Sequence, residues 1–152
     1  MNTRTFAMIF GVVFLILGLG GFIPGLTLMD HNGHQADSEV TVRSFFGYAL
    51  GLFPVNVLHN LVHVIFGIWG ILAAKSYANS RGYFRVVAIA YALFVVMGLV
   101  PGLRTTFGLI PGLRTTFGLI PLYGADIGLH AALALGGAYF GWMNRDTASE
   151  RS

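Results

Sequence analysis

The chain has 152 residues, of which 55% are hydrophobic and only 10% are charged. Because a soluble domain carries about 25% charged residues, this composition argues against a soluble protein and predicts one that lies in a membrane. The net charge of +3 comes from basic residues scattered along the chain, which gives no nucleic-acid-binding patch, and the absence of cysteine excludes disulfides, thiolate metal sites and cysteine nucleophiles.

Four apolar segments each come close to the length of about 20 residues that a helix needs to span a bilayer. The first follows Arg4 as a signal peptide would, but it is long and lacks a small-residue cleavage site, so we interpret it as a retained helix. The sequence therefore predicts an all-α fold, an integral membrane four-helix bundle that forms a single domain over residues 1–152. The predicted segments are helices over 6–28, 54–75, 84–103 and 121–143, with an outer loop over 29–53.

The distribution of basic residues predicts the orientation of this bundle. Six lysines and arginines lie at the two ends of the chain and in the connection between helices two and three, and three lie in the other connections. Basic residues concentrate on the cytoplasmic side of membrane proteins. Both termini are therefore expected in the cytoplasm.

An internal repeat relates the two halves of the chain. The sequence GFIPGL at 21–26 returns as GLVPGL at 98–103, and GLFP at 51–54 returns as GLIP at 118–121. Proline is favoured at the start of a helix, so the prolines at 54 and 121 are expected to begin helices two and four. The repeat predicts two sequence-related helical hairpins with the same orientation, a parallel pseudo-repeat.

A constant shift of 67 residues aligns helix two with helix four and matches polar residues with polar residues. It pairs Asn56 with Tyr123, His59 with Asp126, and His63 with His130. On helix two these positions follow helical spacing, so they share one face, which we expect to point into the bundle. The predicted site consists of His59, His63, Asp126, His130, Asn56, Asn60 and Tyr123. We expect a hydrogen bond or ion pair between Asp126 and His59, and we expect His63 to approach His130.

Three interpretations of this polar set remain open on the residues alone. In the first, the groups hydrogen-bond across the helices and fix their register, as is common in membrane bundles. In the second, they bind a divalent metal ion, for which imidazole and carboxylate are suitable ligands. In the third, His63 and His130 are axial ligands of a haem or a chlorophyll. No cofactor is the default expectation.

One segment of the sequence is anomalous. The decapeptide PGLRTTFGLI occupies 101–110 and returns unchanged at 111–120. Ten extra residues would rotate a helix by a non-integral number of turns, so we expect this tandem decapeptide to lengthen the second outer connection rather than helix three.

Two stretches of this sequence resemble a known family. They are GLFPVNVLHNLVHVIFGIWG at 51–70 and GLIPLYGADIGLHAALALGGAYFGW at 118–142, together with GFIPG near the end of the first segment. They resemble an uncharacterised bacterial family of four-helix membrane proteins, a domain of unknown function frequent in cyanobacteria and actinobacteria. The resemblance covers nearly the whole chain and implies a bacterial inner membrane or a thylakoid, with no established activity.

The sequence contains no set of nucleophile, base and orienting group, and no phosphate-binding loop. We therefore expect a non-enzymatic membrane protein, a structural or accessory subunit that associates with itself or with a larger membrane complex. One alternative is a haem- or chlorophyll-binding protein. A further alternative is a small transporter or proton-relay bundle, because aspartate and histidine inside a membrane also suit a proton relay. Besides the lipid bilayer, the sequence identifies no partner.

Overall fold

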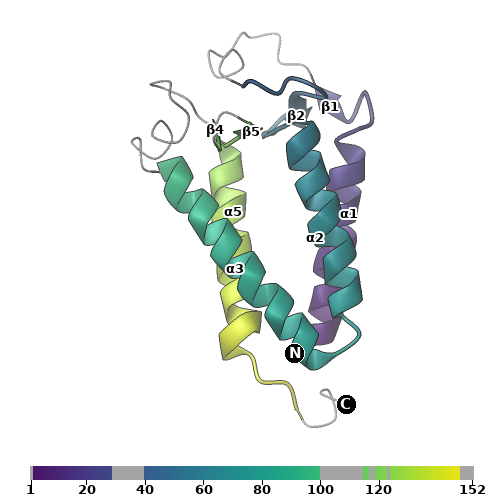
Figure 1. The fold of residues 1–152 in the computed structure, drawn as a ribbon, viewed down its shortest axis with the longest axis vertical. Helices are drawn as coiled ribbons and strands as arrows, with labels where there is room; N and C mark the ends of the chain where they lie inside the picture. Colours follow the sequence, from purple (N-terminus) through teal and green to yellow (C-terminus); the bar gives the residue numbers. More distant parts are fainter. Residues whose placement is uncertain (1, 29–39, 100–114, 117–118, 123, 148–152) are drawn as a thin grey trace.

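The structure, a computed structural model, describes residues 2–28, 40–99, 115–116, 119–122 and 124–147. Within these ranges the chain is mostly helical, and the short strands gather at one end of the molecule, opposite the N-terminus (Figure 1). We call these two ends of the molecule the strand end and the terminal end.

The described residues form four α-helices. Helices α1 (Thr3–Gly20) and α3 (Tyr77–Leu99) are long and apolar enough to cross a membrane. Helix α2 (Val57–Ala73) is apolar and somewhat shorter. Helix α5 (Ala125–Ala138) continues into a π-helical segment, Tyr139–Met143, so its path is longer than its α-helical part.

The expectation of a helical fold is confirmed for most of the described residues, but the strand end contains short strands that were not predicted. Strands β1 (Thr27–Leu28), β2 (Gly47–Ala49) and β3 (Phe53–Val55) form an antiparallel sheet in that order. Strands β4 (Thr115–Thr116) and β5 (Ile120–Pro121) form a second antiparallel pair. Hydrophobicity does not reveal strands of two or three residues, because such segments are shorter than any periodic pattern.

Helices two and four begin later than predicted, at Val57 and Ala125. The two prolines expected at their starts, Pro54 and Pro121, lie instead in β3 and β5. Helix α2 is capped by Asn56, whose side chain accepts a hydrogen bond from the backbone N–H of His59 at 3.0 Å. The true start of α2 is therefore set by this cap and not by the proline.

Helix α1 ends at Gly20, eight residues before the predicted end at residue 28. Pro24 has no backbone N–H to continue the helical hydrogen bonds, and Gly25 has a φ angle of +100°, which the chain needs in order to turn toward β1. The apolar sequence continues past this turn, so a prediction from hydropathy alone placed the end of the helix too late.

Helix α3 begins at Tyr77, well before the predicted residue 84. The hydroxyl of Ser76 accepts a hydrogen bond from the backbone N–H of Asn79 at 3.2 Å and so caps the first turn. This turn is polar because it lies at the terminal end of the molecule, and its composition was mistaken for that of a loop. The predicted end at residue 103 lies outside the described residues.

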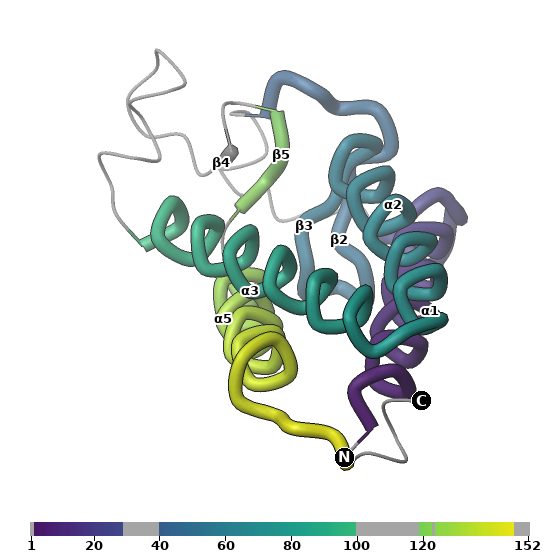
Figure 2. Tube along the Cα trace, turned by 60° about the horizontal axis from the view of Figure 1, so that its bottom comes forward, coloured from purple at the N-terminus to yellow at the C-terminus, as the bar shows by residue number. Residues whose placement is uncertain are grey.

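The helices pack mainly as two pairs, α1 with α2 and α3 with α5, and both views show each pair side by side (Figures 1 and 2). A Cβ atom added at Gly11 of α1 would lie 2.8 Å from the carbonyl oxygen of Gly67. A Cβ atom added at Gly137 of α5 would lie 2.8 Å from the backbone nitrogen of Ala88. In both pairs, glycine thus lets the helix backbones approach more closely than alanine would.

An aromatic core joins the two pairs. The ring of Phe14 on α1 stacks on that of Tyr91 on α3 with centroids 5.8 Å apart, and the ring of Phe6 on α1 stacks on that of Phe140 at 4.5 Å. The buried members of this core are Ala7, Phe14, Ala73, Ala74, Tyr83, Phe84, Val87, Tyr91 and Phe140. The core lies toward the terminal end of the molecule, where it fills the space between the two helix pairs.

Candidate functional site

The polar residues predicted as a site lie at the strand end, mostly between α2 and α5. Six of them are buried among the described residues: Asn56, His59, Asn60, His63, Asp126 and His130. The seventh, Tyr123, lies outside the described residues. No single hydrogen-bonded network joins the six in the described part of the chain, and we describe them in three groups.

The first group consists of His59, Asp126 and His130, which we call the His–Asp–His cluster. One potential ligand atom from each of the three lies within 4.8 Å of those of the other two. Asp126 and His130 are one turn apart on α5, and Asp126 Oδ2 lies 3.6 Å from His130 Nε2. This separation is too long for a good hydrogen bond. Asp126 Oδ2 and His130 Nδ1 are buried without a hydrogen-bond partner among the described residues.

The hydrogen bond or ion pair expected between Asp126 and His59 is not formed. Nδ1 of His59 instead lies 3.1 Å from the carbonyl oxygen of Pro54 in β3. Because α2 begins at Val57, His59 falls in its first turn, close to the strand that precedes the helix. The hydrogen-bond partner of His59 is therefore a backbone carbonyl of β3, and not the carboxylate of Asp126 as predicted.

His63 forms the second group with the aromatic core. Its ring lies 5.4 Å from that of Phe14 and 4.5 Å from that of His59, measured between centroids. Of the two imidazoles on α2, His59 is the one in ring contact with His130, at 6.2 Å. His63 and His130 line the same small cavity, and the ring of His59 also approaches that of His130.

The two asparagines form the third group and face other elements. The Asn56 amide donates hydrogen bonds to the carbonyl oxygens of Val42, at 2.9 Å, and Leu119, at 2.6 Å, so it links segments from both halves of the chain. The Asn60 amide lies against Gly21, where even a Cβ atom would collide with it. Asn60 therefore belongs to the interface between α1 and α2, and Asn56 to the loops above the site.

Tyr91 on α3 is part of the site but was missed by the sequence analysis. Its ring lies 4.9 Å from that of His130, and its buried hydroxyl has no hydrogen-bond partner among the described residues. A signal was available, because the shift that aligns GFIPGL with GLVPGL also pairs Phe14 with Tyr91. The tyrosine was overlooked because helix three is otherwise apolar around it.

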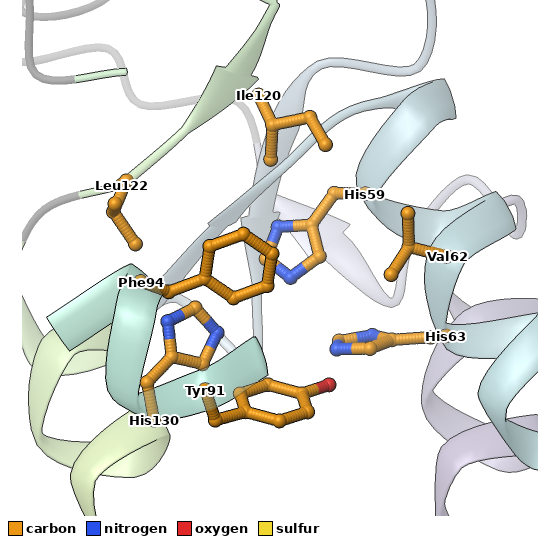
Figure 3. A pocket seen from close by; sticks show the side chains of 8 residues that line it. All are labelled: His59, Val62, His63, Tyr91, Phe94, Ile120, Leu122 and His130. Carbon is orange, nitrogen blue, oxygen red and sulfur yellow. The ribbon is translucent and has the colours of Figure 1, made fainter. Parts of the chain in front are cut away.

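These side chains surround a small cavity (Figure 3). Figure 3 shows His59 and His63 on one side and His130 on the other, with Tyr91 along the edge. The space open to the centre of a water molecule is about 20 Å³, enough for about one water. The cavity is lined by His59, Val62, His63, Tyr91, Phe94, Ile120, Leu122 and His130.

A larger apolar cavity of about 140 Å³, measured in the same way, lies between α1 and α5. His63 lines both cavities, so its ring stands between them. The remaining lining residues are Ile9, Phe10, Val13, Phe14, Leu17, Leu129 and Leu133.

A second buried polar cluster, at the terminal end, was not predicted. The carboxylate of Asp146 accepts hydrogen bonds from the backbone N–H of Thr3 at 2.8 Å and from its hydroxyl at 2.6 Å. The amide of Asn144 donates to the Thr3 hydroxyl and to Asp146. This cluster satisfies its own hydrogen bonds and ties the start of α1 to the chain that follows the π-helical segment.

The two clusters differ in what they can do chemically. The carboxylate of Asp146 is occupied by protein donors, so it serves the fold. The His–Asp–His cluster presents an unpartnered carboxylate oxygen and an unpartnered imidazole nitrogen in a buried place. The amide of Asn60 and the hydroxyls of Tyr83 and Tyr91 are also buried without a partner among the described residues, so what distinguishes this cluster is that three potential metal ligands converge in it.

Comparison with known proteins adds a family but no activity. No curated protein and no solved structure matches the chain. One family model, described as Domain of unknown function (DUF4383), matches residues 4–143. The match reaches all four helices and includes every residue of the candidate site. The chain therefore belongs to this family of unknown function.

Proposed function

We propose that the protein is an integral membrane protein with a small-ligand-binding site enclosed between its two helix pairs. The distribution of polarity supports the membrane part of this proposal. Large apolar side chains on every helix are exposed, for example Ile16 at 64%, Ile65 at 61%, Ile89 at 63% and Leu135 at 74%. The site's polar groups are buried, so the outside suits lipid and the inside holds the polar chemistry.

We further propose that α1 with α2, and α3 with α5, are the two related hairpins expected from the sequence. Nε of Arg4 donates to the carbonyl oxygen of Ala74 at 3.1 Å, and Nε of Arg81 donates to that of Gly141 at 3.1 Å. Arg81 follows Arg4 by 77 residues and Gly141 follows Ala74 by 67, the two shifts that align the halves of the sequence. The same contact at equivalent positions supports a common origin for the pairs.

The strands support the same relation. Tyr48 pairs with Pro54 in the first sheet, and Thr115 pairs with Pro121 in the second. Each residue of the second pair follows its counterpart by 67 residues. The second copy of the tandem decapeptide thus supplies β4, the counterpart of β2, and the first residue of β5, the counterpart of β3.

We also propose that both termini lie in the cytoplasm. Arg4, Arg81 and Arg85 donate to backbone carbonyls at the terminal end, close to the helix ends. Trp69 and Trp142 are partly exposed toward the same end, as expected of tryptophans at a membrane surface.

The unpartnered atoms of the His–Asp–His cluster carry the functional part of the proposal. A scaffold whose polar groups fix the helix register would use those groups on one another, as the Asp146 cluster does. Asp126 Oδ2 and His130 Nδ1 are instead left without a partner among the described residues. This favours a non-enzymatic binding protein over the structural subunit expected from the sequence.

A bound tetrapyrrole and a proton relay both fit the site less well. The cavity that His63 and His130 share has room for about one water, and the larger cavity of about 140 Å³ beside His63 is not lined by His130, so neither holds a large ring between the two histidines. A proton relay would have to cross the aromatic core that lies between the cavity and the terminal end, which is built from apolar and aromatic side chains.

Replacing the unpartnered groups by leucine distinguishes a binding site from a scaffold. In ligand-depleted protein in detergent, Asp126→Leu and His130→Leu should leave the free energy of unfolding unchanged or raise it by about 1–3 kcal/mol, because an unsatisfied buried group is removed. Asp146→Leu is the matched control, since Asp126 and Asp146 are both 1% exposed. It should lower the stability, because the Thr3 donors and the Asn144 amide lose their acceptor.

Equilibrium unfolding in mixed micelles measures all three variants under one condition. If Asp126→Leu and His130→Leu lose as much stability as Asp146→Leu, the cluster holds the fold together and the binding proposal is wrong.

A further inference from the structure

We infer that the His–Asp–His cluster binds a divalent transition-metal ion, with zinc as the best match. The inference rests on the proposed function, because it names the ligand of the same site. The metal would be held by one ring nitrogen from each of His59 and His130 and by a carboxylate oxygen of Asp126. Two imidazoles and one carboxylate are a ligand set that zinc uses together with water.

The distances between the three side chains are slightly longer than those in a metal-bound site. Ligands bonded at about 2.0–2.1 Å in a tetrahedron stand about 3.4 Å apart. Asp126 Oδ2 and His130 Nε2, at 3.6 Å, are already near this separation, so Nε2 of His130, and not its unpartnered Nδ1, is the ring nitrogen placed to bind the metal. All three ligand atoms lie within 4.8 Å of one another, so small side-chain movements would close the site.

The backbone orients one of the ligands in the way that metal sites require. A metal-binding histidine usually donates its second ring N–H to a carbonyl or a carboxylate, which fixes its tautomer. Nδ1 of His59 lies 3.1 Å from the carbonyl oxygen of Pro54, and a carbonyl can only accept. Nδ1 therefore carries the proton and Nε2 keeps the lone pair that a metal needs.

A cation would also compensate the charge of the site. Asp126 is 1% exposed, and no arginine or lysine in the described part of the chain forms an ion pair with it. A carboxylate buried without a cation or a full set of donors is costly. A divalent ion would neutralise this carboxylate and bind the two imidazoles in their uncharged form.

The small cavity supplies the remaining coordination position. Two of the three proposed ligands, His59 and His130, line this cavity, and its volume of about 20 Å³ holds about one water, which fits one open coordination position. His63 lines this cavity and its ring lies 4.5 Å from that of His59. We assign His63 to the surroundings of the metal, where it would hydrogen-bond the bound water.

Cobalt(II) is a suitable probe, because it takes zinc sites and absorbs visible light strongly when its coordination is tetrahedral. The protein should carry no histidine tag, and His31→Ala and His34→Ala should remove the remaining histidines of the sequence. After treatment with a chelator, titration with cobalt should give one tetrahedral site per chain, and zinc should abolish the visible bands.

Variants of the cluster test which residues hold the metal. His59→Gln, Asp126→Asn and His130→Gln should each weaken cobalt binding by more than about 100-fold. His63→Gln is the matched control on α2, and it should keep one site per chain with a loss of at most about 10–100-fold, as for a neighbour of the ligands.

The outcomes separate this inference from the proposed function. If the protein binds neither cobalt nor zinc while His130→Leu still leaves the stability unchanged or raised, the metal assignment is wrong and the site binds another ligand. If binding survives in His130→Gln and Asp126→Asn, the metal lies elsewhere and the assignment is wrong. If His130→Leu loses as much stability as Asp146→Leu, the proposed function fails as well.

Discussion

The close approach of α3 and α5 at Gly137 predicts that this glycine does not tolerate a methyl group. A Cβ atom at this position would lie 2.8 Å from the backbone nitrogen of Ala88 and 2.9 Å from the carbonyl oxygen of Phe84. Both are backbone atoms, so no side-chain rotation can relieve the contact. Normal contacts of carbon lie at about 3.5–4.0 Å, so the two helices would have to separate by about half an ångström or more.

Gly128→Ala is the matched control for Gly137→Ala, because both glycines lie on α5 and a Cβ atom at Gly128 meets no atom of the described residues within 4 Å. In a helix, alanine is favoured over glycine by about 0.5–1 kcal/mol. This gain applies to both variants and cancels in their difference. The difference therefore reports the steric cost, for which overpacked interfaces give about 1–3 kcal/mol.

Equilibrium unfolding of purified protein in mixed micelles measures this difference. We expect Gly128→Ala to be as stable as the parent or more stable, and Gly137→Ala to be less stable than Gly128→Ala by about 1–3 kcal/mol. Equal stabilities of the two variants would refute the reasoning, because α3 and α5 would then not meet at Gly137 as described.

Two further predictions concern the terminal end and the orientation of the chain. Arg4→Met should cost about 1 kcal/mol of unfolding free energy, and Arg81→Met less, because Arg85 also donates to the carbonyl oxygen that Arg81 contacts; equal losses in unfolding experiments would contradict this. Because the chain has no cysteine, Ser44→Cys and Asn79→Cys each give one labelling site, both exposed in the structure. In intact cells an impermeant thiol reagent should modify the cysteine at 44 and spare that at 79, and the reverse pattern would invert the proposed orientation.

Much of the site could be predicted from the sequence because helical periodicity puts residues on one face. His59 and His63 are four residues apart, as are Asp126 and His130, so each pair shares a face of its helix. All four are buried at the strand end, as their common face indicated. Their exact partners could not be predicted, because the helix starts decide which groups they reach.

Pro54 is the clearest example of this limit. From the sequence it was expected to open helix two, whereas in the structure it lies in β3 and its carbonyl oxygen faces His59. The pairing of β3 with β2 decides this placement, and it involves residues from a preceding segment that no local pattern connects to the proline.

The sequence by itself determined that the chain is apolar and mostly helical, and that His59 and His63 share one helix face, as do Asp126 and His130. These properties depend on composition and on spacing along one helix. Only the tertiary structure decided that Tyr91 borders the histidines and that Thr3 meets Asp146, 143 residues away. Such contacts join segments that lie far apart in the sequence, and their geometry depends on how closely the glycines let the helices approach. The spacing of residues along one helix does not determine this distance between helices.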